Sequence, residues 1–309
     1  MNKFLIFSQA IQFAQAQKKP IVALETAVLT HGLPYPANIK LGLDMEVVVR
    51  ENGAEPATIA MIDGKFHIGL SQEQVSFLGN PSKQTKKISR RDIGIAMANR
   101  LNGGTTVCGT LIAAYSARIK VFATGGIGGV HRGNRFDISA DLQELSHTPM
   151  VVVCAGAKSI LDLPATLEYL ETMGVPVIGY ETDIFPAFFS RNSGLPVSAS
   201  VNSPTEVAKI AINHWSMGLN SSILLVVPPP KKSAIDYQKV ESIIVKALEK
   251  AEKQGIHGAD VTPFLLAKVN ELSGGRSMIT NLDLLKNNAR IAATVAVELN
   301  KLDSQPQYI

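Results

Sequence analysis

The chain has 309 residues, of which 46% are apolar and 18% are charged, and its mean hydropathy is +0.13, which excludes a disordered chain and a membrane-embedded bundle. The 30 Lys and Arg residues outnumber the 26 Asp and Glu residues by only four, giving a net charge of +4 that is spread along the chain. Nucleic-acid binding is not implied, because it usually requires a clustered basic stripe. The length suits one large α/β domain or about two average ones.

No signal peptide or membrane span is predicted. The apolar run before Ser8 is shorter than the ~7–15 residues of a signal peptide, and the run at 223–227 is far shorter than the ~18 residues of a membrane span. Cys108 and Cys154 have no partners at metal-ligand spacing, so both are predicted to be reduced core residues. We therefore expect a cytoplasmic protein.

Short Val- and Ile-rich runs predict buried strands, and longer segments between them have helical periodicity. Strands are predicted at 21–24, 58–62, 121–123, 150–154, 175–179 and 223–227. Runs that are apolar on both faces and alternate with helices predict a largely parallel sheet covered on both sides. In the segment 57–70, Asp63-Gly64 between two apolar runs predicts a β-hairpin instead.

Helix boundaries are marked by capping residues. Apolar residues at helical spacing follow Asn38 and end at Gly53, and Ser203-Pro204-Thr205-Glu206 combines an N-cap, an early proline and a capping-box glutamate. Further helices are predicted at 240–255, from 262 onward and at 282–302. Because neither a linker nor an internal repeat divides the chain, we expect a single domain over residues 1–309.

Glu25 ends the first predicted strand of the sheet. In open α/β sheets, ligands bind at the carboxyl ends of the strands. A carboxyl group that loses hydration there has a raised pKa, which suits it to proton donation. The alternative is a glutamate that caps a loop backbone.

A glycine-rich segment, TGGIGGVHRG at 124–133, follows the strand at 121–123. Its glycines allow backbone amides to approach an anion closely. It does not match a dinucleotide-binding fingerprint, because His131 stands where Gly or Ala is required and no helix is predicted directly after it.

Two aspartates flank a predicted helix start at Ser139. Asp137 and Asp141 could converge there, and carboxylate oxygens suit a hard cation such as Mn²⁺ or Mg²⁺. Alternatively, they are first-turn acids that complement the helix dipole.

Lys158 follows the strand at 150–155, in the sequence Gly156-Ala157-Lys158-Ser159. A P-loop requires glycine directly before the lysine, so a nucleotide triphosphatase is not predicted. A lysine at a strand-to-helix turn behind an apolar strand is a candidate imine-forming nucleophile. The alternative is a surface lysine whose stem snorkels past a helix start.

A basic cluster at 83–92 precedes the turn Gly103-Gly104-Thr105-Thr106-Val107. Cations beside a glycine-rich turn fit a pocket for a phosphate monoester. The cluster equally fits a solvated face, and Arg90 and Arg91 equally fit a subunit contact.

Taken together, these segments resemble the pseudouridine-5′-phosphate glycosidase family, also called the indigoidine synthase A-like family. The resemblance is carried by ALETAVLTHGLPYPAN from Ala23, KKISRRDI from Lys86, GGTTV from Gly103, FATGGIGGVHRG from Phe122, FDISADLQEL from Phe136, VVVCAGAKSILDL from Val151 and NLDLLKNNA from Asn281. These segments keep the family order and extend from about residue 21 to about residue 296.

The resemblance implies an enzyme that reversibly cleaves the C–C glycosidic bond of pseudouridine 5′-phosphate with water, giving uracil and ribose 5-phosphate. It implies that Glu25 is the proton donor for opening the ribose ring and that Lys158 is the nucleophile that forms an imine with C1′. It also implies one Mn²⁺ per subunit, held by Asp137.

Further positions match the family's substrate contacts. The matching residues are Lys87, Thr106 and Val107 for the phosphate, Ser139, Ala140 and Asp141 in a substrate-binding segment, and His131 and Asn281 around the sugar or uracil. The implied fold is a three-layer α/β/α domain that forms a homotrimer and binds a small molecule rather than nucleic acid or a membrane. The loop at 132–135 is shorter than in the family pattern, and Arg276 stands where lysine is expected.

Two alternative functions use the same residues. A class I aldolase-like enzyme acting on a phosphosugar would also need Lys158, Glu25 and a phosphate pocket. A non-catalytic accessory protein in pigment biosynthesis is suggested by the family's older name, but the presence of Glu25, Asp137 and Lys158 together argues against it.

Overall fold

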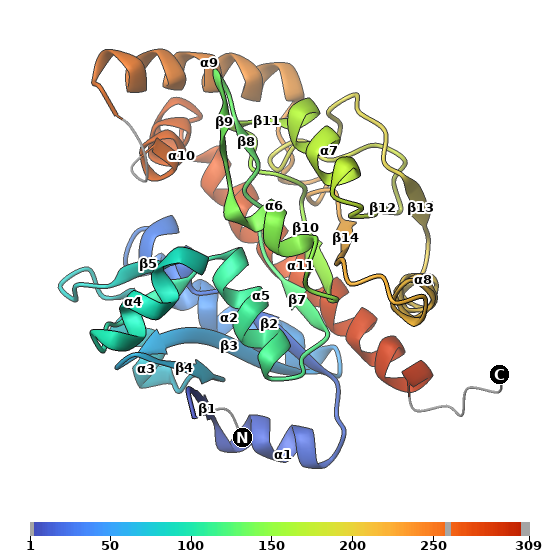
Figure 1. Cartoon of the computed structure of the whole chain (residues 1–309). Helices are drawn as coiled ribbons and strands as arrows, with labels where there is room; N and C mark the ends of the chain where they lie inside the picture. The colour runs from blue at the N-terminus through green and yellow to red at the C-terminus, as the bar shows by residue number, and fades with distance from the viewer. Residues whose placement is uncertain (1–2, 257–260, 304–309) are drawn as a thin grey trace.

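The computed structural model describes residues 3–256 and 261–303, and its centre is one extended mixed sheet (Figure 1). The strands of this sheet are β1 (Leu5–Phe7), β2 (Ile21–Leu24), β3 (Glu55–Ile62), β4 (Lys65–Ile68), β5 (Lys86–Ile88), β6 (Gly103–Thr105), β7 (Val121–Ala123), β10 (Val151–Cys154), β12 (Val177–Tyr180), β13 (Ala199–Val201) and β14 (Ile223–Val226). Their order is β1-β4-β3-β2-β7-β10-β14-β12-β13, and β6 pairs with both β3 and β5.

The sheet is parallel from β3 through β2 and β7 to β13, as predicted. Its antiparallel pairs join β3 to β4 and β3 to β6. Every residue of β10 and β14 is fully buried, because helices cover both faces of these central strands.

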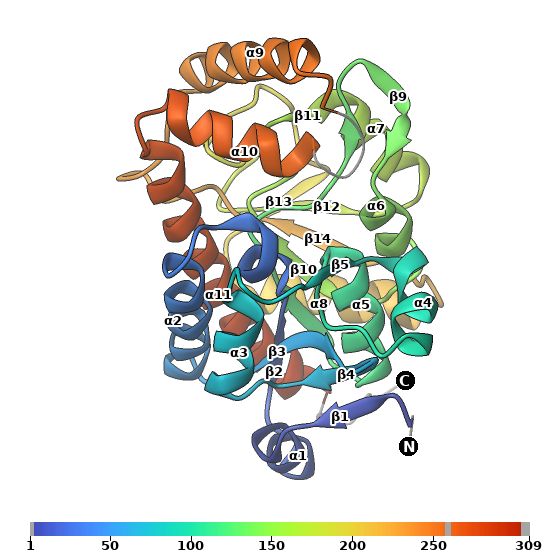
Figure 2. The same cartoon turned by 90° about the vertical axis from the view of Figure 1, so that its left-hand side faces the viewer.

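Eleven α-helices lie among the described residues and surround the sheet. They are α1 (Gln9–Ala16), α2 (Ala37–Glu51), α3 (Gln72–Gly79), α4 (Ile93–Ala98), α5 (Val107–Ser116), α6 (Ala140–Leu145), α7 (Leu163–Thr172), α8 (Pro204–Ser216), α9 (Tyr237–Lys253), α10 (Val261–Leu272) and α11 (Arg276–Asp303). Helix α11 packs on β2, β7 and β10 with α2 and α8 beside it, whereas α5 packs on β2, β3 and β4. Figures 1 and 2 show α5 and α11 on opposite faces of the sheet, so the predicted three-layer α/β/α fold is confirmed.

A small antiparallel sheet, which was not predicted, stands beside the main one. It consists of β8 (Val130–His131), β9 (Asn134–Ile138) and β11 (Leu161–Asp162), in the order β11-β8-β9. This sheet brings the end of the glycine-rich segment against the chain that follows Lys158, since Leu161 pairs with His131.

Several local predictions are confirmed in detail. Asp63 and Gly64 turn between β3 and β4 with φ values of 51° and 71°, the left-handed conformation of a two-residue hairpin. Ser203 caps α8 by accepting a hydrogen bond from the Glu206 N–H at 3.3 Å. Cys108 and Cys154 are free and buried, and burial raises the pKa of each thiol to about 12.

Most predicted elements have bounds that differ from the observed ones by one to three residues, and two differences are larger or concern the site. Helix α11 begins at Arg276 rather than at 282, directly after Gly274 and Gly275, which adopt left-handed φ values of 62° and 81°. The turn at Lys158 was predicted to lead directly into a helix, but the chain first enters β11. The next helix, α7, starts after β11, where Asp162 caps it by accepting a hydrogen bond from the Ala165 N–H at 3.0 Å.

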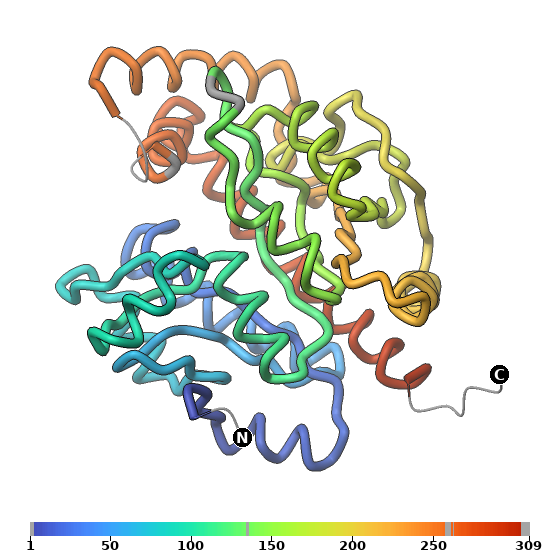
Figure 3. The backbone as a smooth tube through the Cα atoms, in the orientation of Figure 1, coloured from blue at the N-terminus to red at the C-terminus, as the bar shows by residue number. Residues whose placement is uncertain are grey.

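The path of the chain places its two halves on either side of α11. In Figure 3 the backbone up to α5 forms one half, the segment from β8 to α10 forms the other, and α11 runs past both. Figure 2 shows α9 and α10 together at the end of the molecule opposite α1. No helix among residues 3–256 and 261–303 is long and apolar enough to cross a membrane.

Candidate active site

A small cavity of about 70 Å³ lies where β2, β7 and β10 end, and it brings together four of the predicted site residues, Glu25, Lys87, Lys158 and Asn281. Glu25 and Lys158 follow the ends of β2 and β10, Lys87 lies within β5, and Asn281 comes from α11. The complete lining consists of Glu25, Ala27, Val28, His31, Gly32, Lys87, Gly125, Gly126, Lys158, Phe188, Pro263, Leu266, Asn281 and Leu285. The mixture of an apolar wall with a few convergent polar groups is typical of a ligand site.

Glu25 is partly buried at the end of β2 and faces Thr124, which follows β7. The Thr124 hydroxyl donates a hydrogen bond to Glu25 Oε1. Burial raises the pKa of Glu25 above its usual value, although the Lys158 charge and the Thr124 hydrogen bond oppose this effect. The carboxyl group is therefore suited to carry a proton, as the sequence predicted.

Lys158 is held in its turn by backbone hydrogen bonds on both sides. Its N–H donates to the Ile127 carbonyl at 3.0 Å, and its own carbonyl accepts from the Leu161 N–H at 3.0 Å. Its side chain lines the same cavity as Glu25 and Lys87, and its charge opposes the rise of the Glu25 pKa and contributes to the lowered pKa of Lys87. An acid and an amine therefore share one small cavity.

Lys87 and the N-terminus of α5 form the part of the site with positive potential. Lys87 pairs with Gly104 across β5 and β6, so the lysine and the turn that leads into α5 are neighbours. Thr106 caps α5 by accepting a hydrogen bond from the Gly109 N–H at 3.3 Å, and Val107 is the first helical residue. Desolvation and the charge of Lys158 lower the pKa of Lys87. A lysine beside a helix N-terminus suits a phosphate group.

Asp141 is buried and does not line the cavity. Its Oδ1 accepts a hydrogen bond from the Cys108 N–H at 2.9 Å, in the first turn of α5. Its Oδ2 accepts one from the Gly128 N–H at 2.8 Å, in the glycine-rich segment. The Asp141 carboxylate therefore connects the N-terminus of α5 to the glycine-rich segment that follows β7.

Ser139 and Ala140 directly precede Asp141 in the chain, and the Ser139 side chain packs against Gly128 of the glycine-rich segment. Ser139 caps α6, as predicted, by accepting a hydrogen bond from the Asp141 N–H at 3.3 Å. A Cβ atom at Gly128 would collide with the Ser139 hydroxyl, so this close approach requires glycine. Thr106, Val107, Ser139 and Ala140, which were predicted as substrate contacts, do not line the cavity.

Asp137 and His131 stand apart from the cavity on the β8–β9 hairpin. Asp137 Oδ2 lies 3.9 Å from His131 Nδ1, and half of the Asp137 side chain is exposed. Within the described residues, no three His, Cys, Asp or Glu side chains are grouped closely enough to hold a metal ion. Carboxylate and imidazole groups are suitable ligands for Mn²⁺, but the remaining positions would need water or substrate atoms.

Arg90, from the basic cluster, has a partner within the chain. Its Nε donates to Glu144 Oε2 at 2.8 Å, and Glu144 is buried on α6. Arg90 therefore braces the chain next to Lys87 against α6 within one subunit.

Most of the apolar and glycine residues that line the cavity were not predicted as site residues, and neither were His31, Phe188 and Leu266. His31 lies in a π-helical turn at Val28–Gly32, and burial and the charge of Lys87 lower its pKa. Phe188 has a left-handed φ of 59° and packs against Gly126, where a Cβ atom would come within 2.6 Å of the ring. Leu266 comes from α10. His31 could have been predicted, because it lies in the loop that directly follows Glu25. No pattern in the sequence predicts that Phe188 or Leu266 lines this cavity.

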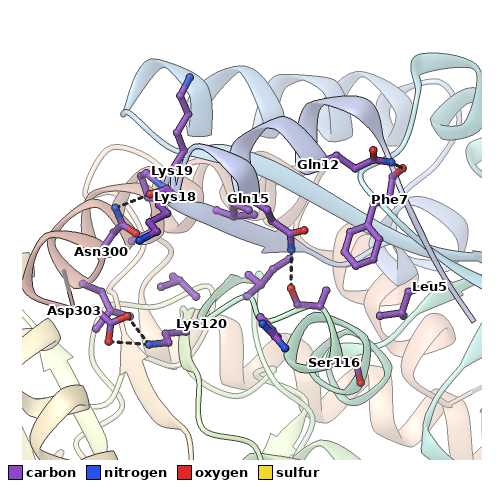
Figure 4. Close-up of a pocket in the computed structure, with 18 residues that line it drawn as sticks. Leu5, Phe7, Gln12, Gln15, Lys18, Lys19, Ser116, Lys120, Asn300 and Asp303 are labelled. Carbon is purple, nitrogen blue, oxygen red and sulfur yellow. Dashed lines mark hydrogen bonds and ion pairs between the residues drawn. The ribbon is translucent and has the colours of Figure 1, made fainter. Parts of the chain in front are cut away.

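A larger cavity of about 720 Å³ lies at the opposite edge of the sheet, where β2 and β7 begin (Figure 4). Lys18 and Arg118 follow the C-terminal ends of α1 and α5, where cations complement the helix dipole. Lys120 pairs with Asp303 at 2.9 Å. None of the predicted site residues lines this cavity, so the smaller one is the candidate active site.

The chain matches known proteins over nearly its whole length. A family model described as indigoidine synthase A-like protein matches residues 10–298. The chain is 52% identical over 304 residues to the pseudouridine-5′-phosphate glycosidase of Caldanaerobacter subterraneus subsp. tengcongensis, covering 98% of this chain and 99% of that protein. It is 48% identical over 302 residues to the pseudouridine-5′-phosphate glycosidase of Escherichia coli, covering 97% of each.

Solved structures show the same fold. A prealnumycin C-glycosynthase in complex with ribulose 5-phosphate superposes with a TM-score of 0.91 at 38% identity, covering 98% of this chain and 99% of that one. An indigoidine synthase A-like protein from Thermotoga maritima superposes with a TM-score of 0.88 at 36% identity, covering 96% of this chain and 97% of that one.

Proposed function

Since the chain belongs to the indigoidine synthase A-like family, we propose that it is a pseudouridine-5′-phosphate glycosidase, a C-glycosidase that acts in pseudouridine catabolism. The reaction reversibly converts pseudouridine 5′-phosphate and water to uracil and ribose 5-phosphate. The observation that carries the chemistry is the convergence of Glu25 and Lys158 on one cavity, with Lys87 at its wall.

The C–C bond dictates the type of catalysis. A C-glycoside has no leaving-group oxygen that an acid could protonate, so a pair of carboxylates acting as in ordinary glycosidases would not suffice. Opening the ribose ring at C1′ offers another route. Glu25 donates a proton to the ring oxygen as the C1′–O bond breaks, a role that its raised pKa supports.

Lys158 then supplies the electron sink. Its amine bonds to C1′ of the opened sugar and gives one proton to the Glu25 carboxylate, which restores the nitrogen lone pair. This lone pair forms the C1′=N bond as the bond between C1′ and uracil breaks, and the electron pair leaves with uracil, whose C5 takes the proton from Glu25. Water hydrolyses the imine, which releases ribose 5-phosphate and restores the amine.

The phosphate binds beside Lys87 at the N-terminus of α5, where Thr106 and Val107 begin the helix. His131 and Asn281 contact the sugar or uracil, and the segment at 139–141 supports the substrate from behind the glycine-rich segment. The cavity of about 70 Å³ is smaller than the ~300–1,000 Å³ of typical ligand pockets, so it must widen when substrate binds. Helix α10 contributes Pro263 and Leu266 to the wall that would move.

The proposed cofactor is one Mn²⁺ per subunit, held by Asp137 with His131 nearby. The bound cation would contribute positive charge next to the substrate oxygens. Binding is tested apart from activity by measuring free Mn²⁺ by electron paramagnetic resonance during titration. We expect Asp137→Ala to lose the bound ion, whereas unchanged binding would place the ligand elsewhere.

We propose that the protein forms a homotrimer in the cytoplasm. The trimer is what the family resemblance implies, and exposed large apolar side chains such as Ile95 and Tyr115 could be covered in an assembly. The free buried cysteines suit a reducing compartment. Sedimentation equilibrium should give three times the chain mass of 33.1 kDa, and a monomer would contradict the assembly.

Uracil release from pseudouridine 5′-phosphate, with and without EDTA, tests the function directly. We expect uracil and ribose 5-phosphate in equal amounts. Borohydride trapping alone would not distinguish this enzyme from an aldolase, because both form an imine. Absence of uracil with Mn²⁺ present would therefore exclude the proposed function.

A further inference from the structure

Arg132 connects three parts of the molecule next to the candidate active site. It follows His131 in the turn between β8 and β9, and only 24% of its side chain is exposed. Its guanidinium group donates hydrogen bonds to the chain after Lys158 and to a carboxylate on α9. Arg132 takes no part in the proposed reaction steps.

The first set of contacts fixes the turn that carries Lys158. Arg132 Nη2 donates to the Ser159 carbonyl at 3.0 Å, directly after the lysine, and Nε donates to the Leu161 carbonyl at 3.0 Å. One planar group therefore holds two carbonyls of the same turn in a fixed relation to β8. These two hydrogen bonds restrict the conformations of the backbone that carries the Lys158 side chain.

The second set of contacts joins the same group to α9. Nη1 and Nη2 bind the two oxygens of Glu241, with Nη2 at 3.0 Å from Oε2. Helix α9 packs against α10, and α10 contributes Pro263 and Leu266 to the cavity. Arg132 therefore links the turn at Lys158 to the helix pair that forms the cavity wall.

We propose that Arg132 is a positioning residue that fixes the Lys158 turn for attack on the substrate and couples this turn, through Glu241, to the α9–α10 pair. The proposal rests on the proposed function, in which Lys158 is the nucleophile. Arginine is required because its planar fork has five N–H donors, four of which are used here. A lysine keeps the charge but cannot bind two carbonyls and both carboxylate oxygens at once.

The test compares Arg132→Lys with a matched control, Arg100→Lys. Arg100 binds both oxygens of Asp63, at 2.8 and 2.6 Å, and does not line the cavity. Measured quantities are the kcat and KM for uracil release, and the rate at which borohydride traps ribose 5-phosphate on the enzyme. Each rate is divided by the folded fraction determined by circular dichroism.

For Arg132→Lys we expect kcat and the trapping rate to fall together by roughly 10- to 100-fold, because small displacements of a reacting group cost about this much. The KM should change by less than about 3-fold, since Lys87 and α5 are untouched. Arg100→Lys should behave as the wild type. Glu241→Gln keeps the contacts to the two carbonyls and should lose about 3- to 10-fold in kcat.

A trapping rate per folded molecule that is unchanged in Arg132→Lys would overturn the positioning role. An unchanged kcat in Glu241→Gln would overturn the coupling to α9. If the wild type traps ribose 5-phosphate but releases no uracil, the proposed function fails, and the trapping comparison still decides the role of Arg132.

Discussion

Asp141 offers a quantitative test, because the structure and the family resemblance give it different roles. Its side chain is buried, and its two oxygens accept hydrogen bonds from the N–H groups of Cys108 and Gly128 at 2.9 and 2.8 Å. The resemblance implies direct substrate contact, whereas these contacts predict that Asp141 supports the site by holding α5 to the glycine-rich segment. The two roles differ in their effect on the free energy of unfolding.

The magnitude follows from the two hydrogen bonds. A hydrogen bond to a charged group contributes about 1.5–3 kcal/mol. Asp141→Ala removes two such bonds and leaves both N–H groups without their acceptor, so it should lower the free energy of unfolding by about 3–5 kcal/mol. Asp141→Asn keeps one acceptor oxygen, so a loss of about 2 kcal/mol is expected.

Urea unfolding of both variants measures this effect, with Asp236→Asn as the control. Asp236 caps α9 at an exposed position through one hydrogen bond, from the Lys239 N–H at 3.1 Å, so its loss should cost no more than about 1 kcal/mol. The KM for pseudouridine 5′-phosphate should rise in Asp141→Asn more than the KM for the dephosphorylated nucleoside, because the N-terminus of α5 loses its support.

An Asp141→Ala variant that unfolds within about 1 kcal/mol of the wild type, with an unchanged slope, would refute this reasoning. If such a variant also bound the substrate poorly, Asp141 would be a direct substrate contact.

Three further predictions concern the cavity residues. Lys158→Ala should lose more than ~10³-fold in kcat, and near-normal turnover would exclude the imine. Lys87→Ala should raise the KM for the phosphorylated substrate and affect the dephosphorylated nucleoside much less; equal effects would argue against a phosphate role. The kcat should fall as pH rises through the raised pKa of Glu25, because only the protonated carboxyl donates. Thr124→Val removes a hydrogen bond that lowers this pKa, so the fall should move to higher pH; an unchanged or lower position would contradict the assignment.

The elements that were predicted well from the sequence are those that depend on interactions between residues close together in the chain. The strand Ile21–Leu24 was predicted with its observed bounds because an apolar run next to a polar segment is itself the signal. The start of α8 followed from Ser203 and Glu206, which interact three residues apart. The β8–β9–β11 sheet escaped prediction because β8 and β11 have only two residues each and pair across about 30 residues of sequence, and because the local β8–β9 pairing has an irregular register.

The sequence by itself determined which side chains stand at strand ends, since burial of apolar runs in a parallel sheet places Glu25 and Lys158 at one edge. It also placed a basic cluster before a glycine-rich turn at 103–107, where an anion could bind, whereas only the family resemblance singled out Lys87 and Thr106. Only the tertiary structure decided which partners the charged side chains around the site bind. The partners of Asp141, Arg90 and Arg132 are as far as 33, 54 and 109 residues away in the chain. Their roles depend on which segments the fold brings into hydrogen-bonding distance, and no local pattern contains that information.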